Sequence, residues 1–172
     1  MAGTVDSYTI RYKSWILADA YECYDSYDKL LYKIRPNLLW TRLDLADISG
    51  GAAGTVRRKF WSYEFSFHDA SGQLIGTVTR DAIKDAHGMT IAKAKKMRSD
   101  RVTKPGYVMM DCEITDPKDG SLIAMVSDWD PKLSVFRGDF PRLVLIEFAM
   151  ASFIHMGFDA FLKRVRRFGG FM

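Results

Sequence analysis

The stretch that decides the fold runs from Phe140 to Val165 and reads FPRLVLIEFAMASFIHMGFDAFLKRV. Pro141 suits the first turn of a helix, where a missing N–H costs little, and Asp139 before it is a candidate N-cap. Basic residues crowd positions 163–167, where cations suit the negative end of the helix dipole, and Gly169-Gly170 then stops the helix. The stretch therefore predicts one long C-terminal helix.

This predicted helix is apolar on most of its sides, so it needs cover on most of its sides. A helix that spans a membrane needs about 20 mainly apolar residues. Here Arg142, Glu147 and Asp159 interrupt the sequence, and the chargeless run from Phe148 to Phe158 is too short. We therefore expect burial in protein rather than in lipid, with the rest of the chain as the wrapper. The narrow polar stripe of the helix consists of Ser152, His155, Asp159, Lys163 and Arg166.

The bulk composition is that of one ordinary globular domain. The chain has 172 residues, of which 48% are hydrophobic and 27% are charged, and its net charge of +4 permits an acidic partner without requiring one. The first residues, MAGTVDSYTIR, contain no hydrophobic signal region, so we expect a cytoplasmic protein. Cys23 and Cys112 form neither a metal spacing nor a disulfide framework, which favours two structural cysteines in a reducing compartment.

Before the helix, short strands alternate with turns. The clearest strand is Arg58–Phe67, in which aromatic residues occupy alternate positions from Trp61 to Phe67 and predict a half-buried strand with an aromatic face. The segment Asp81–Asp85 has no apolar helical period and predicts at most a short turn. The other predicted strands are Tyr8–Trp15, Leu30–Ile34, Leu38–Leu45, Leu74–Thr79, Met89–Ala94, Tyr107–Thr115 and Leu122–Ser127.

The predicted turns repeat an Asp-Gly signature. Asp suits such turns because it accepts hydrogen bonds from nearby backbone N–H groups, and Gly adopts positive φ. Copies that precede a short apolar strand predict successive hairpins, and many short hairpins predict a barrel or a sandwich. The copies are Asp69-Ala-Ser-Gly72, Asp85-Ala-His-Gly88 and Asp116-Pro-Lys-Asp-Gly120, with Asp47-Ile-Ser-Gly50 as a candidate fourth.

With these residues the chain resembles the tubby C-terminal-like superfamily, which includes phospholipid scramblases and LURP-one-related proteins. The resemblance is carried by the opening strand Tyr8–Lys13, by the turn-strand units HDASGQLIGTVTR and TDPKDGSLIAMVSD, and by an Asp-Phe-Pro that leads into an apolar helix containing Gly157-Phe158-Asp159. It implies a mainly β domain (α+β) in which a closed, twelve-stranded barrel surrounds a central hydrophobic helix. The domain is expected to span residues 1–172, with its core at about 8–165 and a basic tail at 163–172.

Two features of the scramblases are missing here. Scramblases are similar in carrying an acidic calcium-binding segment before the last helix, and Asp128, Asp130 and Asp139 lie in that region. However, Lys132 and Arg137 separate them, and calcium requires several oxygen ligands at close spacing, so we favour turn and cap roles over a metal site. The Pro-rich and Cys-rich N-terminal extension is also missing, so palmitoyl anchoring has no support.

No motif gives positive evidence for catalysis. His68, His87 and His155 lie far apart and form no metal pattern, so structural or solvated roles are favoured. The glycine-rich segment Ser49–Thr55 lacks the Lys-Ser/Thr that ends a phosphate loop, which favours a flexible connection. No G-x-S-x-G elbow occurs. We expect no cofactor and no metal, and we favour a non-enzymatic protein, while an enzyme of unrecognised type stays open.

Basic clusters provide the candidate binding surface. Such clusters attract phosphate oxygens of lipid headgroups or nucleic acid, although a solvated face that binds nothing is the simpler interpretation. Lys93 and Lys95 would share one face of an extended strand, so their charges would add. The aromatic residues beside the first cluster suit a core face better than a base-stacking platform, which makes nucleic acid a weaker candidate. The candidate residues for anionic headgroups are Arg57, Arg58, Lys59, Lys93, Lys95, Lys96 and Arg98.

Two functions follow as hypotheses. The first is a non-enzymatic tubby-like domain that binds anionic phospholipid headgroups or a protein partner, in the cytoplasm or at the membrane periphery. The alternative is a carrier of a small apolar ligand, in which a sheet wraps a C-terminal helix as in START-like domains and leaves a cavity.

Overall fold

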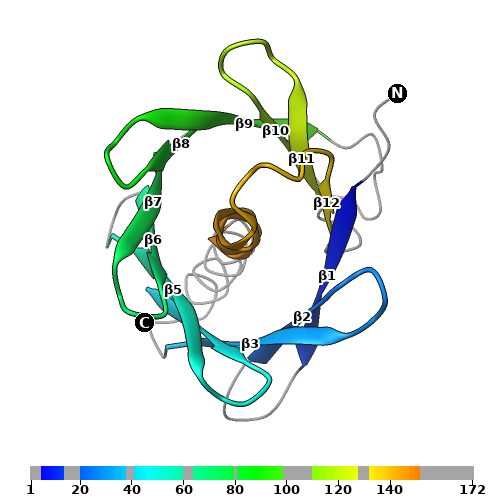
Figure 1. Cartoon of the computed structure of the whole chain (residues 1–172), viewed down its shortest axis with the longest axis vertical. Helices are drawn as coiled ribbons and strands as arrows, with labels where there is room; N and C mark the ends of the chain where they lie inside the picture. Colours follow the sequence, from blue (N-terminus) through cyan, green and yellow to red (C-terminus); the bar gives the residue numbers. More distant parts are fainter. Residues whose placement is uncertain are drawn as a thin grey trace, which may run out of the picture.

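The computed structural model describes residues 5–13, 20–37, 41–59, 64–79, 81–98, 110–127 and 132–151. These residues form a closed barrel of twelve strands with a helix inside it (Figure 1). Each strand pairs antiparallel with the next strand in the sequence, and β12 returns to pair with β1. Closure of this meander gives each described strand a neighbouring strand on both sides.

All strands are short, as the recurring turns predict. Their bounds are β1 Asp6–Lys13, β2 Ala20–Tyr24, β3 Leu30–Pro36, β4 Arg42–Asp47, β5 Ala52–Arg58, β6 Glu64–Asp69, β7 Leu74–Thr79, β8 Ala82–Asp85, β9 Thr90–Arg98, β10 Met110–Thr115, β11 Leu122–Ser127 and β12 Lys132–Val135.

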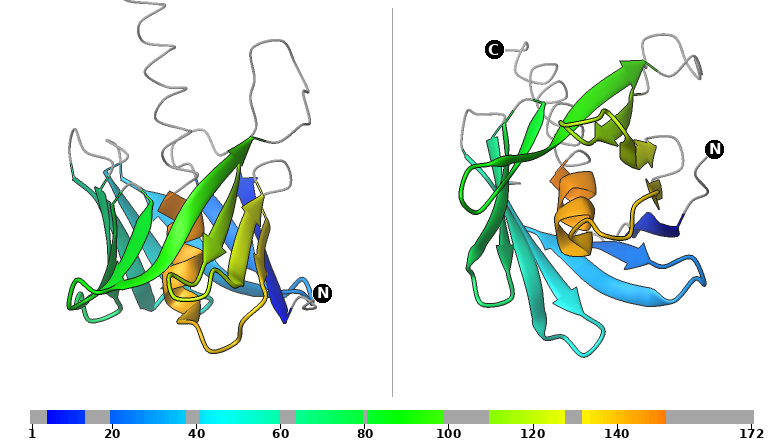
Figure 2. Two further views of the ribbon diagram at one scale, coloured as in Figure 1. Left: turned by 90° about the horizontal axis from the view of Figure 1, so that it is seen from above. Right: turned by 45° about the horizontal axis from the view of Figure 1, so that its top comes forward.

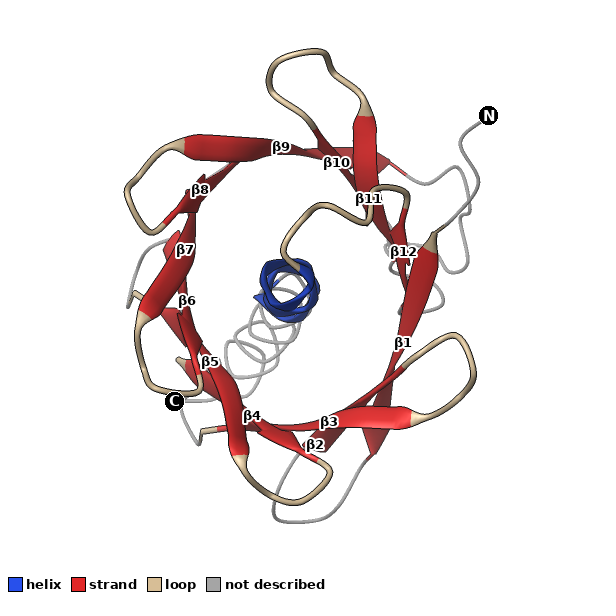
Figure 3. Cartoon of the chain, in the orientation of Figure 1, coloured by secondary structure: helices blue, strands red, loops and turns tan. Residues whose placement is uncertain are grey.

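The C-terminal helix begins at Arg142, and its described part covers residues 142–151. After β12 the chain turns back at one end of the barrel and enters the interior (Figures 2 and 3). From Val144 to Ala151 every residue is at most 5% exposed. Each fully buried aliphatic side chain stabilises the fold by about 2 kcal/mol. Packing inside the barrel wall therefore buries the apolar helix, as predicted from the sequence. Within the described residues, no helix combines the length and the apolar content of a membrane span.

The start of the helix differs in detail from the prediction. The backbone N–H of Leu145 donates to the carbonyl of Pro141 at 3.3 Å, so Pro141 and not Asp139 is the residue that caps the first turn. The Asp139 carboxylate is instead held by Arg137. Arg142, the first helical residue, lies over the ring of the buried Tyr8 at 4.8 Å from its centroid, which ties the helix start to β1. The predicted polar stripe, from Ser152 to Arg166, lies outside the described residues.

Several strand predictions were wrong. Ser49–Thr55 is not a flexible connection, because β5 begins at Ala52 and is a full member of the wall. Asp81–Asp85 is not a turn, because 82–85 forms β8. The predicted strand Arg58–Phe67 is divided: Arg58 ends β5, and β6 begins at Glu64. β2 and β12 were not predicted. These segments are short or rich in Gly, Ala and polar residues, so their burial comes from the closed barrel and not from their own hydrophobicity.

Five hairpins turn at the barrel end where the helix enters (Figure 2): four repeat one turn, and the hairpin at Asp116 has one residue more, with the Ser121 N–H bonded to Asp119. In the turn that starts at Asp69, the Asp69 carboxylate accepts hydrogen bonds from the N–H groups of Ser71 and Gln73, and Gly72 has a φ of 83°. The turns at Asp47 and Asp85 show the same bonds, which confirms the predicted signature, including its candidate fourth copy. The copy at Asp25 was missed because Asp28 takes the glycine position, with a φ of 62°. We call this end of the barrel the turn end.

Candidate functional site

The outer face of the wall carries two arginines directly opposite each other. Arg42 on β4 pairs in register with Arg57 on β5, and both side chains are exposed. The Arg42 Nε donates to Asp44 Oδ1 at 2.7 Å, whereas Arg57 has no ion-pair partner among the described residues. Opposite positions on neighbouring strands place Cβ atoms about 5 Å apart, and like charges there are destabilising. Arg42 and Arg57, which we call the arginine pair, therefore leave positive charge unbalanced on this face.

The other two residues of the first predicted cluster do not extend this face. Arg58 follows Arg57 on β5 and therefore occupies the inward register, opposite the buried Phe65, with its side chain half-buried. Lys59 is exposed, and its Nζ lies 3.5 Å from Glu64 Oε2, so its charge is partly balanced. Three consecutive basic residues thus separate into three different environments, and only Arg57 joins the arginine pair.

The second predicted cluster lies on β9. Lys93 and Lys95 are exposed, while Ala92 and Ala94 between and beside them are buried, so the two lysines share the outward face as strand alternation requires. Lys95 lies opposite Glu113 on β10. Lys84 on β8 lies diagonally beside Lys93 and adds to the same face, a contribution that was missed because 81–85 was interpreted as a turn. Lys96 and Arg98 belong to β9, but their side chains lie outside the described part of the chain.

The two clusters lie apart on the wall. The strand order places β6, β7 and β8 between β5 and β9. With strands about 4.8 Å apart, the four steps correspond to roughly 19 Å along the wall. Four of the twelve steps are a third of the circumference, so the outward faces of β5 and β9 also point in different directions, and a single phosphate group cannot contact both clusters (Figure 1).

Charge also differs between the two ends of the barrel. Acidic residues dominate the turn end and basic residues the opposite end, so the barrel is electrically polar along its axis. The turn end carries Asp6, Asp25, Asp28, Asp47, Asp69, Asp85, Asp116, Asp119 and Asp139 against Arg11, Lys29, Lys84, Lys118, Arg137 and Arg142. The described side chains at the opposite end are Arg35, Arg42, Arg57, Arg58, Lys59 and Lys132 against Glu64 and Asp81.

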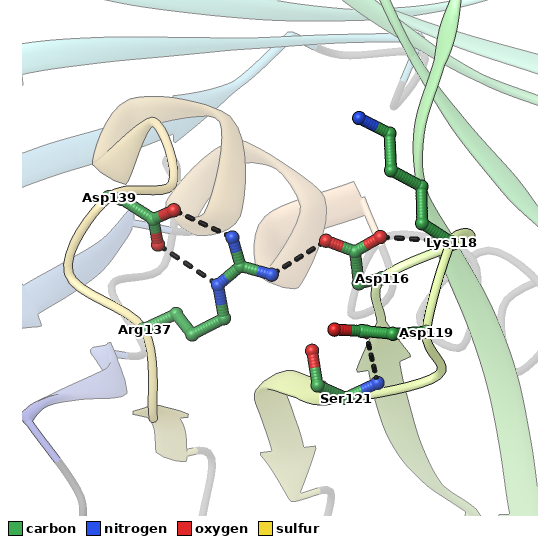
Figure 4. A network of polar contacts seen from close by, with 6 residues as sticks. All are labelled: Asp116, Lys118, Asp119, Ser121, Arg137 and Asp139. Carbon is green, nitrogen blue, oxygen red and sulfur yellow. Dashed lines mark hydrogen bonds and ion pairs between the residues drawn. The ribbon is translucent and has the colours of Figure 1, made fainter.

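The turn-end charges are largely engaged in local structure. Arg137 donates from Nε and Nη2 to Asp139 at 3.0 and 2.6 Å and from Nη1 to Asp116 at 2.6 Å, and Asp119 accepts from the Ser121 N–H (Figure 4). The bond from the Lys118 N–H and the Arg137 guanidinium lower the pKa of Asp116. Arg137 is the main cause that lowers the pKa of Asp139. This network, which we call the Arg137 network, joins the β10–β11 turn to the segment that leads into the helix.

Exposed apolar side chains also gather at the turn end. Among the described residues the large hydrophobic side chains with high exposure are Val5, Tyr27, Ile48 and Met89, at 64%, 90%, 61% and 67%. Tyr27, Ile48 and Met89 occupy turns between consecutive strands, and Val5 precedes β1 at the same end. Scattered exposed apolar residues are ordinary, but their restriction to one end is a second difference between the ends.

The barrel interior contains one carboxyl group that sequence reasoning used only as an argument against a membrane span. Glu147 is 0% exposed, and neither of its carboxyl oxygens has a hydrogen-bond partner among the described residues. Burial raises its pKa to about 9; the Thr55 backbone amide opposes this shift, and the Asp69 charge reinforces it. The sequence did contain a signal for this group, because Glu147 is a residue of charged type within a helix that was predicted to be buried.

The histidines and cysteines bring no catalytic group together in the described residues. His87 is exposed in its turn, and burial and the Arg57 charge lower the pKa of His68, which keeps its imidazole neutral at neutral pH. Cys23 and Cys112 are buried, and burial raises the pKa of Cys23 to about 12, so its reactive thiolate is suppressed. His155, Asp128 and Asp130 lie outside the described residues. No group of three or more metal-ligating side chains gathers in the described ranges.

Comparison with known proteins gives two findings. The family model of LURP-one-related proteins matches residues 6–145. An X-ray structure of a protein from Arabidopsis thaliana is similar with a TM-score of 0.59 and 15% identity, over 87% of this chain and 91% of that one. At this identity the structural likeness shows the fold alone. No curated protein sequence matches.

Proposed function

The chain belongs to the LURP-one-related family of the tubby-like superfamily, and from this premise we propose that it is a non-enzymatic domain that binds anionic phospholipid headgroups at a membrane surface. The observation that carries the proposal is the arginine pair. Arg42 and Arg57 lie opposite each other in the sheet register, and their shared positive charge is only partly offset by Asp44. A bound phosphate group offsets the repulsion between the two arginines, because guanidinium groups bind phosphate oxygens through paired, charge-assisted hydrogen bonds.

The lysines of β9 supply a second contact. Lys93 and Lys95 lie on one outward face, roughly 19 Å along the wall from the arginine pair. Each basic residue near an anionic leaflet contributes about 1 kcal/mol, so the two contacts together favour a bilayer over one isolated headgroup. Of the seven residues predicted from the sequence, Arg57, Lys93 and Lys95 form the centre of the proposed contact, and Arg42 joins them.

The polarity of the barrel sets its orientation at the membrane. An anionic surface attracts the basic end and repels the acidic turn end. The protein is therefore expected to approach with the ends of β5 and β9 that lie away from the turns. In this orientation the turn end and its apolar side chains face away from the lipid.

The test is cosedimentation of the full chain with vesicles. Binding to vesicles that contain phosphatidylinositol bisphosphate, with little binding to pure phosphatidylcholine and with loss at high salt, is the expected result. Free inositol trisphosphate serves as competitor: weak competition supports a contact with the bilayer, and full competition at low concentration assigns a single-headgroup site instead. Equal binding to neutral and anionic vesicles would contradict the proposal.

A second candidate is a protein partner at the turn end, favoured by the exposed Tyr27, Ile48 and Met89 within an acidic surround. The acidic turn end attracts a basic partner surface by charge complementarity. The basic end of a second copy of this chain is such a surface. Sedimentation velocity of the wild type and of the Tyr27→Ser, Ile48→Ser, Met89→Ser triple variant tests this. Salt-sensitive self-association that the triple variant lacks supports the candidate, and a monomer at all concentrations excludes self-association.

The carrier of an apolar ligand gains no support from the interior. The helix is buried from Val144 to Ala151, and at Gly54 the wall comes so close that a Cβ would lie 2.5 Å from Glu147 Oε1. This part of the barrel is filled by the chain itself.

A further inference from the structure

One polar side chain lies where the barrel is otherwise apolar. Glu147 is the one buried residue of charged type in the described core, and it lies among the apolar helix residues Val144, Ile146 and Phe148. An ionised carboxylate in such a place costs far more than a neutral acid unless it is paired. Neither carboxyl oxygen of Glu147 has a hydrogen-bond partner in the described residues, and the Thr55 backbone amide offsets the cost of an ionised form only in part.

The wall is shaped to accept this side chain. The position that a Cβ would occupy on Gly54 lies 2.5 Å from Glu147 Oε1 and 3.1 Å from the carbonyl oxygen of His68. Any other residue on β5 at this point would collide with the carboxyl group. Gly54 has no positive φ, so its need for glycine comes from the close approach of the helix and not from backbone conformation.

We propose that Glu147 is a proton-dependent latch: the helix packs against β5 with Glu147 as a neutral acid, and loss of that proton opens the helix from the wall. The open state is one in which the carboxyl group reaches water. The latch couples the packing of the central helix to pH, whatever the outer face binds.

The direction of this coupling follows from the two states of the carboxyl group. In water a glutamate has an ordinary pKa of 4.5, and burial raises the pKa of Glu147 in the packed helix to about 9. Between these values the packed state holds one proton more than the open state. The opening constant therefore rises about ten-fold per pH unit in this window, and it is independent of pH below and above it. Packing is tightest at acid pH and weakens as the pH rises through neutrality.

The neighbouring titratable groups leave this direction unchanged. Asp69 on β6 is ionised through the window, because the bonds from Ser71 and Gln73 lower its pKa, and its negative charge disfavours ionisation of Glu147. His68 on β6 is neutral above its lowered pKa. Arg57 lies on the outer face of β5 and lowers the pKa of His68. The helix residues next to Glu147, Ile146 and Phe148, are apolar.

Amide hydrogen exchange of the full chain tests the latch. Protection of the amides at 145–151 is measured at pH 5.5, 6.5 and 7.5 and corrected for the intrinsic exchange rates. The opening constant of the wild type is expected to rise about 100-fold across these two pH units, and that of Glu147→Gln to stay within about three-fold, because the amide cannot ionise. Amides in β11, which do not depend on local opening of the helix, serve as the internal reference.

The variants separate the latch from other causes. His68→Asn is expected to keep the wild-type slope, which distinguishes Glu147 from imidazole titration. Glu147→Leu provides a second non-ionisable residue if Glu147→Gln does not fold. A flat wild-type profile, or an equal slope in the wild type and a folded Glu147 variant, would overturn the proposal.

Discussion

Each face of β5 meets an ionisable group that the fold leaves without an ion-pair partner among the described residues, and the two groups respond in opposite ways. On the inner face, Gly54 receives the Glu147 carboxyl, which has no hydrogen-bond partner in the described residues. On the outer face, Arg57 lies opposite Arg42 and has no ion-pair partner there. Inside the barrel, water is excluded and the carboxyl group keeps its proton. Outside, a guanidinium cannot lose its proton, so its charge stays available to an anion.

The comparison separates two uses of an unbalanced charge. A buried group exchanges a proton and so reports on pH, whereas an exposed group attracts a counter-charge and so provides binding. The Arg137 network shows the third case, an arginine whose charge two carboxylates satisfy and which acts in structure alone (Figure 4).

The largest effect is expected on the inner face. Gly54→Val places a branched side chain where even a Cβ meets Glu147 Oε1, and overpacking of this kind destabilises by about 3 kcal/mol. Chemical denaturation measures the loss. Thr55→Val, one residue along and on the other face, is the control and is expected to lose much less. Equal losses would mean that the close approach at Gly54 has no special cost.

Replacing the buried acid is expected to have the next largest effect. Glu147→Leu removes the polar group and is expected to gain unfolding free energy over the wild type at pH 8, because the folded wild type holds a proton there that the unfolded chain releases. Between pH 8 and pH 5 the gain is expected to shrink by about 1.4 kcal/mol for each pH unit, since the folded state holds one proton more than the unfolded chain over most of this range. Urea unfolding at the two pH values measures this, and a gain independent of pH would contradict the assignment of the proton to Glu147.

The Arg137 network is expected to matter less. Arg137→Ala removes the ion pairs to Asp116 and Asp139, but these groups are partly exposed, so solvent screening keeps the loss of stability small. Thermal unfolding measures it. Vesicle binding is expected to be unchanged, and a clear loss of binding in a folded Arg137→Ala protein would show that the turn end takes part in the contact.

The outer face is expected to have the smallest effect on stability. Arg57→Gln removes a like-charge contact with Arg42 and is expected to raise the unfolding free energy by about 0.3 kcal/mol. Chemical denaturation at low salt measures this change, and high salt is expected to abolish it. A marked loss of stability would mean that Arg57 supports the fold and is not held for a ligand.

The sequence predicts the architecture well because the helix and the turns are local signals. An apolar stretch that must be covered, together with Asp-Gly turns of fixed hydrogen bonding, leads to hairpins closed around a helix, and the match to the LURP-one-related family confirms that interpretation. Strands such as β5 and β8 could not be predicted in this way, since Gly54 is buried by its closeness to Glu147 and not by its own hydrophobicity.

The candidate site was predicted only in part for a related reason. Runs of basic residues are visible in sequence, and they gave Arg57, Lys93 and Lys95. The pairing of Arg57 with Arg42 depends on strand register, and the inward turn of Arg58 depends on where β5 ends. Strand register and the ends of strands cannot be deduced from local composition. A run of basic residues in the sequence therefore does not show which of them lie on the same face of the sheet.

The most direct test of the proposed function is the vesicle affinity of the double variant Arg42→Gln, Arg57→Gln beside a charge-matched double variant at the turn end, Lys29→Gln, Lys118→Gln. At about 1 kcal/mol for each basic residue near the membrane, the arginine double variant is expected to bind phosphoinositide vesicles about 30-fold more weakly than the wild type. The turn-end variant is expected to bind as the wild type does. Equal weakening in the two variants would reduce the interaction to net charge, and unchanged binding of the folded arginine variant would remove the arginine pair from the contact.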